Sequence, residues 1–133
     1  MHPRQHILCV TLAMLALVSC HRITPVEMTK SAITETFVRI GIYAQTNRAV
    51  PPSLAVLPKR DGYANRTTDG WGRPLRYSLA TNGIIALTSF GRDGKPGGSG
   101  EDADTSESYF TKKSDGSLWV GSDLWIVEAQ VRQ

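Results

Sequence analysis

The stretch LRYSLATNGIIALTSFGRDGKPGGSGEDAD, from Leu75 to Asp104, contains two strand-like runs followed by a loop rich in glycine and acidic residues. The runs LRYSLA and IIALTSF are separated by Thr81-Asn82-Gly83, and an Asn-Gly pair between such runs is typical of a β-hairpin turn. After Phe90, almost no side chain of the stretch is apolar. We therefore expect an antiparallel hairpin that leads directly into a glycine-rich acidic loop.

The residues upstream predict an amphipathic helix. Thr24 can cap it, Pro25 suits the first helical position, and Glu27 completes a capping box. Two prolines follow shortly after Asn47, so the helix is expected to end near that residue. Apolar residues that recur at helical spacing define one face: Ile33, Phe37, Ile40 and Ala44. Charged residues are expected off that face: Lys30, Glu35 and Arg39.

The other segments complete an α+β prediction. Residues 50–68 are expected to be irregular, with Leu54, Val56 and Leu57 packed under the helix. After the loop, the runs SYFTKK and SLWVG flank Ser114-Asp115-Gly116 and predict a second hairpin. The run DLWIVEAQV follows as a final strand, with a short helix as the alternative. We expect one N-terminal amphipathic helix packed on a small antiparallel β-sheet.

The first residues of the chain predict an export signal. Arg4 gives them a basic start, and an apolar run extends from Ile7 to Val18. A helix that spans a bilayer needs about 20 apolar residues, and a run of about a dozen is typical of the central region of a signal peptide. A short membrane anchor that is never cleaved is the alternative.

The end of this apolar run, Leu17-Val18-Ser19-Cys20, resembles the lipobox of bacterial lipoproteins. The resemblance implies cleavage before Cys20 and attachment of lipid to that cysteine. Several acyl chains on one residue would hold a protein stably to a membrane. His21 follows the cysteine, which implies the outer membrane, facing the periplasm. The expected organisation is a lipoprotein signal peptide, a lipidated tether and a folded domain, at residues 1–19, 20–23 and 24–133.

The positions of the histidines and cysteines exclude several kinds of site. All three histidines and both cysteines lie in or beside the leader, so the folded part contains neither residue type. A Ser-His-Asp or Cys-His site therefore cannot be built there, and a disulfide or a zinc site with soft ligands is excluded too. We expect no enzyme, although a small hydrolase that uses carboxylates alone stays open. A net charge of +3 gives little support for a nucleic-acid partner.

The acidic loop has the composition of a calcium site. Asp93, Asp102 and Asp104 offer carboxylates, and the glycines between them allow backbone carbonyls to turn inward. Calcium prefers about six to eight oxygen ligands, whereas magnesium requires a stricter octahedron. Three close carboxylates repel one another, and with Lys95 as the nearby lysine we expect the loop to open without a cation. A merely polar, solvated loop is the alternative.

Two motifs carry a family resemblance. The turn DGWGRPLRYS and the loop LTSFGRDGKPGGSGEDAD, in that order and at that spacing, resemble the globular domain of the major pseudopilin of type II secretion, the GspG type. The matching residues of the turn are Asp69, Trp71, Gly72 and Tyr77. The matching residues of the loop are Gly91, Asp93, Gly94, Gly97, Gly98, Gly100, Asp102, Ala103 and Asp104.

The resemblance implies a ligand set and a way of acting. Calcium in the family is held by loop carbonyls and aspartates, which here correspond to the carbonyls of Phe90 and Ser99 and the carboxylates of Asp93, Asp102 and Asp104. Members also carry a long N-terminal helix that assembles into a fibre, and here we expect a lipid anchor in its place. The expected function is a lipid-anchored, calcium-stabilised, pseudopilin-like periplasmic protein that acts by protein–protein contact. An envelope lipoprotein that serves as a binding module unrelated to secretion is the alternative.

Overall fold

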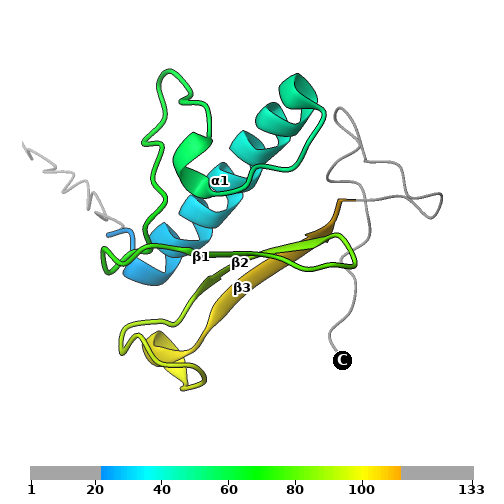
Figure 1. Ribbon diagram of the computed structural model, residues 1–133. Coiled ribbons are helices and arrows are strands. Elements are labelled where there is room, and N and C mark those ends of the chain that lie inside the picture. Colours follow the sequence, from blue (N-terminus) through cyan, green and yellow to red (C-terminus); the bar gives the residue numbers. More distant parts are fainter. Residues whose placement is uncertain (1–21, 112–133) are drawn as a thin grey trace, which may run out of the picture.

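The computed structural model describes residues 22–111, which form one helix packed on a three-stranded sheet (Figure 1). Helix α1 spans Pro25–Asn47, and a 3-10 turn, η1, spans Leu54–Val56. Strands β1 (Arg76–Leu79), β2 (Ile84–Ser89) and β3 (Thr105–Phe110) pair antiparallel in that order, with a second 3-10 turn, η2 (Gly100–Asp102), before β3. The α+β prediction is confirmed. The leader, Cys20, the turn and second strand of the second predicted hairpin, and the final predicted strand lie outside the described residues.

Both ends of α1 follow local sequence signals. The backbone N–H of Glu27 donates to the Thr24 hydroxyl at 3.2 Å, and the Thr24 N–H donates to the Glu27 carboxylate at 2.7 Å. This capping box satisfies N–H groups that the first helical turn cannot pair internally. At the other end, Arg48 turns the chain away in the left-handed region, with φ of 54°. The predicted limits of the helix are therefore confirmed.

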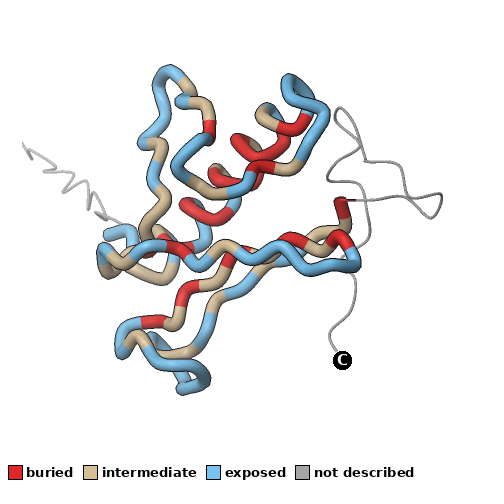
Figure 2. The backbone as a smooth tube through the Cα atoms, viewed as in Figure 1, coloured by how far each residue is buried: buried red, intermediate tan, exposed pale blue. Residues whose placement is uncertain are grey.

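The core lies between α1 and the sheet, where buried positions of both elements face each other (Figure 2). Every residue of the predicted apolar helix face is buried: Ile33, Phe37, Ile40 and Ala44. Ile85 and Leu87 face them from β2 and are at most 1% exposed. Full burial of such a side chain contributes about 1.5–3 kcal/mol, so this layer supplies much of the stability of the described fold.

One charged residue of α1 is buried although it lies off the predicted apolar face. Arg39 was expected off the apolar face, yet it is 4% exposed. Its guanidinium donates to the carbonyls of Pro58, Asn65 and Leu57 at 2.8, 3.1 and 3.4 Å. The irregular segment after the helix folds back over this side chain and provides these acceptors. Helical spacing alone does not reveal them, because the acceptors belong to a segment distant in the sequence.

The connection between helix and sheet is irregular, as expected, apart from η1. Leu57 is buried at 6% exposure and Leu54 packs against the core. Val56 was predicted to pack under the helix, and this is wrong, since the residue is 45% exposed. The 3-10 turn rotates Val56 outward while Leu57, the next residue, points inward. The hydroxyl of Tyr77 on β1 donates to the Pro51 carbonyl at 2.8 Å and ties the connection to the sheet.

The hairpin around the Asn-Gly pair forms as predicted. Leu79 pairs with Ile85, and Gly83 adopts a φ of 82° while its N–H donates to the Ala80 carbonyl at 2.9 Å. The next strand, predicted to start at Ser108, begins three residues earlier at Thr105, because β3 pairs with β2 from the loop exit onward. None of the helices in residues 22–111 has the length and apolarity that a membrane crossing requires.

Candidate functional site

The glycine-rich loop connects β2 to β3 at one end of the sheet, where Figure 1 shows it folding into a compact bend. Its base is closed by the pairing of Ser89 with Thr105. Backbone hydrogen bonds then cross the loop, with the N–H of Arg92 donating to the Glu101 carbonyl at 2.8 Å. The loop is therefore an ordered closure of the sheet with its own hydrogen bonds.

Two glycines allow the loop to close this tightly. Gly91 and Gly98 have φ of 59° and 84°, in the region that favours glycine. A Cβ at Gly91 would lie 2.6 Å from the carbonyl oxygen of Asp102, and a Cβ at Gly98 would lie 2.5 Å from the same oxygen. Both sides of the loop thus pack against the backbone of Asp102, and the loop depends on glycine at these two positions.

Four of the five predicted calcium ligands accept backbone N–H groups within the loop. The Asp93 carboxylate accepts from Lys95 N at 2.9 Å, and the Asp104 carboxylate accepts from Gly97 N at 3.0 Å. The predicted carbonyl ligands are used in the same way: the Phe90 carbonyl accepts from Gly94 N and the Ser99 carbonyl from Asp102 N, both at 3.1 Å. These oxygens sit in tight turns and brace the loop.

The fifth predicted ligand, Asp102, is bound by an arginine. Arg92 donates from Nε to Oδ1 of Asp102 at 2.9 Å and from Nη2 to Oδ2 at 3.1 Å, which makes a bidentate pair. Its third nitrogen, Nη1, donates to Glu101 at 3.1 Å. The hydrogen bond and the charge of Asp102, followed by the charges of Glu101 and Asp93, raise the pKa of Arg92 above its usual value.

The loop acids do not converge on one point in this arrangement. Across residues 22–111, no three side chains of the metal-binding types lie together closely enough to share an ion. The donor chemistry does match calcium, since all the candidate atoms are carboxylate or carbonyl oxygens. The guanidinium of Arg92 stands in for a cation beside Asp102. Calcium binding by this loop therefore stays a prediction.

A second arginine fastens the loop to the turn that precedes β1. The guanidinium of Arg73 donates to the carbonyls of Gly91, at 3.1 Å, and Arg92. Asp69, 5% exposed, accepts from the backbone N–H of Arg73 at 2.9 Å and from the hydroxyl of Ser89 at 2.8 Å. Turn and loop are thus one hydrogen-bonded unit built around a buried carboxylate.

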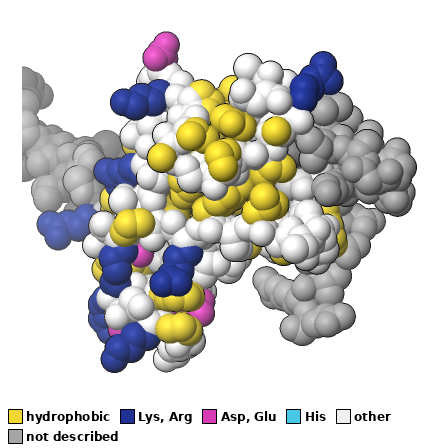
Figure 3. All heavy atoms as spheres, in the orientation of Figure 1, with side chains coloured by type: hydrophobic (Ala, Val, Ile, Leu, Met, Phe, Trp, Pro, Cys, Tyr) yellow, Lys and Arg dark blue, Asp and Glu magenta, His cyan; other side chains and the backbone are white. Residues whose placement is uncertain are grey.

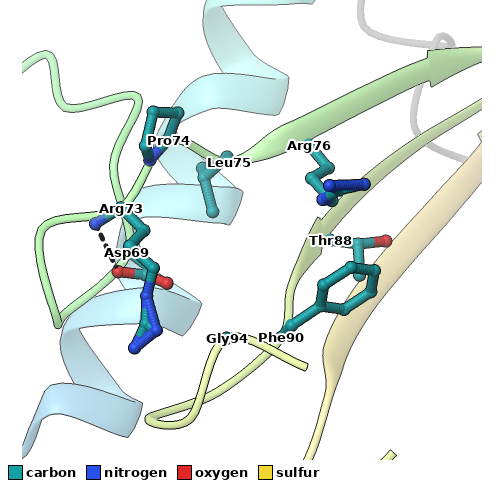
Figure 4. A pocket seen from close by; sticks show the side chains of 8 residues that line it. All are labelled: Asp69, Arg73, Pro74, Leu75, Arg76, Thr88, Phe90 and Gly94. Atoms are coloured by element: carbon teal, nitrogen blue, oxygen red, sulfur yellow. Dashed lines mark hydrogen bonds between the residues drawn. The ribbon is translucent and has the colours of Figure 1, made fainter. Parts of the chain in front are cut away.

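Figure 4 shows a hollow beside this unit, with Asp69 and Arg73 on one side and Phe90 opposite. The guanidinium of Arg76 lies over the ring of Phe90, 4.6 Å from its centre. The carboxylate of Asp69 is already committed to backbone and hydroxyl donors. The arrangement holds the turn against the sheet, and the Asp69 carboxylate acts as a structural acceptor.

The sequence interpretation missed both arginines that hold the loop. It considered Lys95 as the nearby cation and overlooked Arg92, which directly precedes Asp93. The signal was present, since an arginine beside an acidic loop is a natural counter-charge. Arg73 carried no comparable signal, because its acceptors are backbone carbonyls that any sequence contains.

The comparisons with known proteins agree with this geometry. Residues 41–108, about half of the chain, match the family model described as type II secretion system (T2SS), protein G. The match runs from the last turns of α1 into β3, so it includes the hairpin and the whole glycine-rich loop. A search of curated proteins found no match.

Proposed function

The chain belongs to the type II secretion system protein G family, and we propose that it is a lipid-anchored, pseudopilin-like subunit that acts in the envelope by protein–protein contact. The observation that carries the proposal is the family match over residues 41–108. It covers the end of α1, the connection, the hairpin and the glycine-rich loop, and the motif resemblance to the family is thereby confirmed. Members of a secretion apparatus act by contacting other components, so the partners are expected among those components.

The surface supports a role in protein contact. Figure 3 shows hydrophobic side chains gathered in the middle of one face, with lysine and arginine side chains around them. Several large apolar side chains of the described part are exposed: Ile23, Ile42, Val56, Tyr63 and Leu79. Exposed apolar area with a charged surround is typical of a surface that another protein covers.

Photo-crosslinking in cells tests the proposed partners. A photoreactive residue is introduced separately at Val56, Tyr63 and Leu79, which are 45%, 53% and 51% exposed. Capture of secretion-apparatus components, identified by mass spectrometry, is the expected result. The same residue at Thr34, an exposed polar position of α1, is the matched control. Capture of envelope proteins unrelated to secretion from all three positions would favour the binding-module alternative.

The proposed anchor is a lipid on Cys20. The support is the lipobox-like Leu17-Val18-Ser19-Cys20 directly after an apolar run. A Cys20→Ala protein is expected to lose incorporation of labelled fatty acid and to leave the membrane fraction. Cys9→Ala is the matched control, because Cys9 lies within the predicted leader. Separation of the inner and outer membranes then tests the proposed location in the outer membrane, which rests on His21.

We also propose that the loop binds calcium through the oxygens named above. The carboxylates of Asp93 and Asp104 would hold the ion together with the carbonyls of Phe90 and Ser99. Asp102 would join them only by leaving Arg92, to which both its oxygens are now bonded. A bound divalent ion would neutralise the loop acids and link metal binding to folding.

Thermal unfolding tests the calcium proposal. The melting temperature is expected to rise with calcium, to rise less with magnesium and to fall in chelator. An Asp93→Asn protein should lose most of the calcium response. An equal melting temperature of the normal protein in calcium and in chelator would exclude this part of the proposal and leave the family assignment unaffected.

A further inference from the structure

Arg92 is tied across the loop by both its backbone and its side chain. Its N–H donates to the Glu101 carbonyl at 2.8 Å, while its guanidinium reaches the carboxylates of Glu101 and Asp102. The backbone of Arg92 therefore holds Glu101, and its side chain holds both Glu101 and Asp102. The ring of contacts keeps the beginning and the end of the loop together.

The guanidinium of Arg92 is bonded to the same two oxygens of Asp102 that would bind a metal ion. Both oxygens of Asp102 face guanidinium nitrogens, at 2.9 and 3.1 Å. A divalent cation close to that carboxylate would meet the positive charge of Arg92 at short range, where like charges repel strongly. The carboxylates of Asp93 and Asp104 are different, since within residues 22–111 each accepts from an uncharged backbone N–H and neither is bonded to a guanidinium. Direct competition for the same oxygens is thus at Asp102, among the contacts of the described residues.

We infer that the guanidinium of Arg92 and a calcium ion are alternative counter-charges for Asp102, so that Arg92 sets the calcium concentration at which the loop takes up metal. This inference rests on the calcium binding proposed above. The arginine form keeps the loop closed without metal, and the calcium form requires Arg92 to swing into solvent. The guanidinium can do so at little cost, because its side chain is already 57% exposed.

Removal of the charge at Arg92 is the direct test. In R92Q the competing charge is gone, and a shorter, uncharged polar side chain remains. We expect its calcium affinity to increase roughly tenfold over the normal protein, since both the ion pair and the like-charge repulsion are removed. R92K keeps the charge but loses the bidentate geometry, so its affinity is expected between the two.

The matched control is R76Q. Arg76 is also an exposed arginine beside the loop, but its guanidinium lies over the Phe90 ring and has no carboxylate partner within residues 22–111. Calcium affinity is measured by isothermal titration with calcium chloride, on the full-length protein in detergent. The melting temperature in chelator is measured on the same samples. It is expected to fall in R92Q and to change less in R76Q.

Each outcome decides the inference. Calcium binding that is tighter in R92Q than in both the normal protein and R76Q supports it, whereas binding by R92Q but not by the normal protein excludes calcium from the native function and overturns the inference for the native loop. Equal affinity of R92Q and the normal protein overturns the inference and leaves the calcium proposal standing. An increase in R76Q equal to that in R92Q overturns it as well, because a general charge effect would explain both. The absence of binding in every protein excludes the inference and the calcium proposal together.

Discussion

Two irregular segments of this fold are held by arginines in opposite ways. The connection at residues 48–75 is fastened by Arg39, which is 4% exposed and donates to three backbone carbonyls. The loop at residues 90–104 is fastened by Arg92, whose side chain is 57% exposed and pairs with two carboxylates. The first arginine is surrounded by protein, whereas the second faces solvent and salt.

This difference in burial predicts that the connection is a fixed part of the fold and that the loop is an adjustable one. A buried guanidinium that loses its acceptors has no water to replace them. Any other arrangement around Arg39 would therefore cost considerable free energy. Exposed ion pairs contribute little and exchange easily with ions from solution. We therefore expect the connection to determine stability, and the loop to respond to its surroundings.

Replacement of Arg39 is expected to have the largest effect. Arg39→Met keeps the apolar stem but leaves the carbonyls of Leu57, Pro58 and Asn65 without their donor. The free energy of unfolding should fall by about 3–5 kcal/mol, as in other buried polar networks that lose one partner. Denaturant unfolding followed by circular dichroism measures the change. Arg39→Lys, with fewer donors, should lose less, and a loss below about 1 kcal/mol in Arg39→Met would show that the connection does not depend on this side chain.

A glycine pair tests the loop. Gly98→Ala places a Cβ 2.5 Å from the Asp102 carbonyl oxygen and also strains a φ of 84°. Gly97→Ala has a similar φ of 92°, with no atom within 4 Å of the new Cβ. We expect the free energy of unfolding to fall by about 2–3 kcal/mol in Gly98→Ala and by about 1 kcal/mol in Gly97→Ala. Equal losses in the two would mean that the loop relaxes away from the contact.

Local signals explain why the helix and the hairpin could be predicted from the sequence. The capping box at Thr24 and Glu27 and the turn at Asn82-Gly83 act over a few residues, so neighbouring positions determine them. The burial of Arg39 could not be predicted in the same way. Its acceptors lie 18 to 26 residues further along the chain, and only the folded connection brings them to the helix.

The contacts within the candidate site could not be predicted from the sequence either, although they join residues that are closer together in the chain. Composition singled out the glycines and aspartates of the loop, and their role as calcium ligands stays a prediction. The partner of each acid was not predictable, because five glycines with positive φ give the loop many possible paths. Which carboxylate meets Arg92 depends on the path taken. Pairing within such a loop is a property of its folded backbone.

Alkaline pH weakens the connection through Tyr77, whose hydroxyl donates to the Pro51 carbonyl. Burial raises the pKa of Tyr77 from 10.0 to about 12. The unfolded chain therefore releases this proton first, and the stabilising contribution, complete below about pH 10, is lost as the pH rises toward about 12. A tyrosinate absorbance titration should show late components from Tyr77 and from Tyr109, whose pKa burial also raises, and Tyr77→Phe should remove the one near pH 12. In neutral solution the free energy of unfolding of Tyr77→Phe should be lower by about 1 kcal/mol, the net contribution of one hydrogen bond.

Salt is expected to have the smallest effect, and it acts on the loop. In low salt, R92Q should melt only slightly below the normal protein, by about 2 °C or less, because exposed pairs contribute little. In 1 M sodium chloride the screening length is about 3 Å, so the difference between the two proteins should disappear. The loss of stability in Arg39→Met should persist in 1 M sodium chloride, since salt hardly screens hydrogen bonds to buried carbonyls. A salt response of equal size in both would mean that the connection and the loop are held by the same kind of interaction.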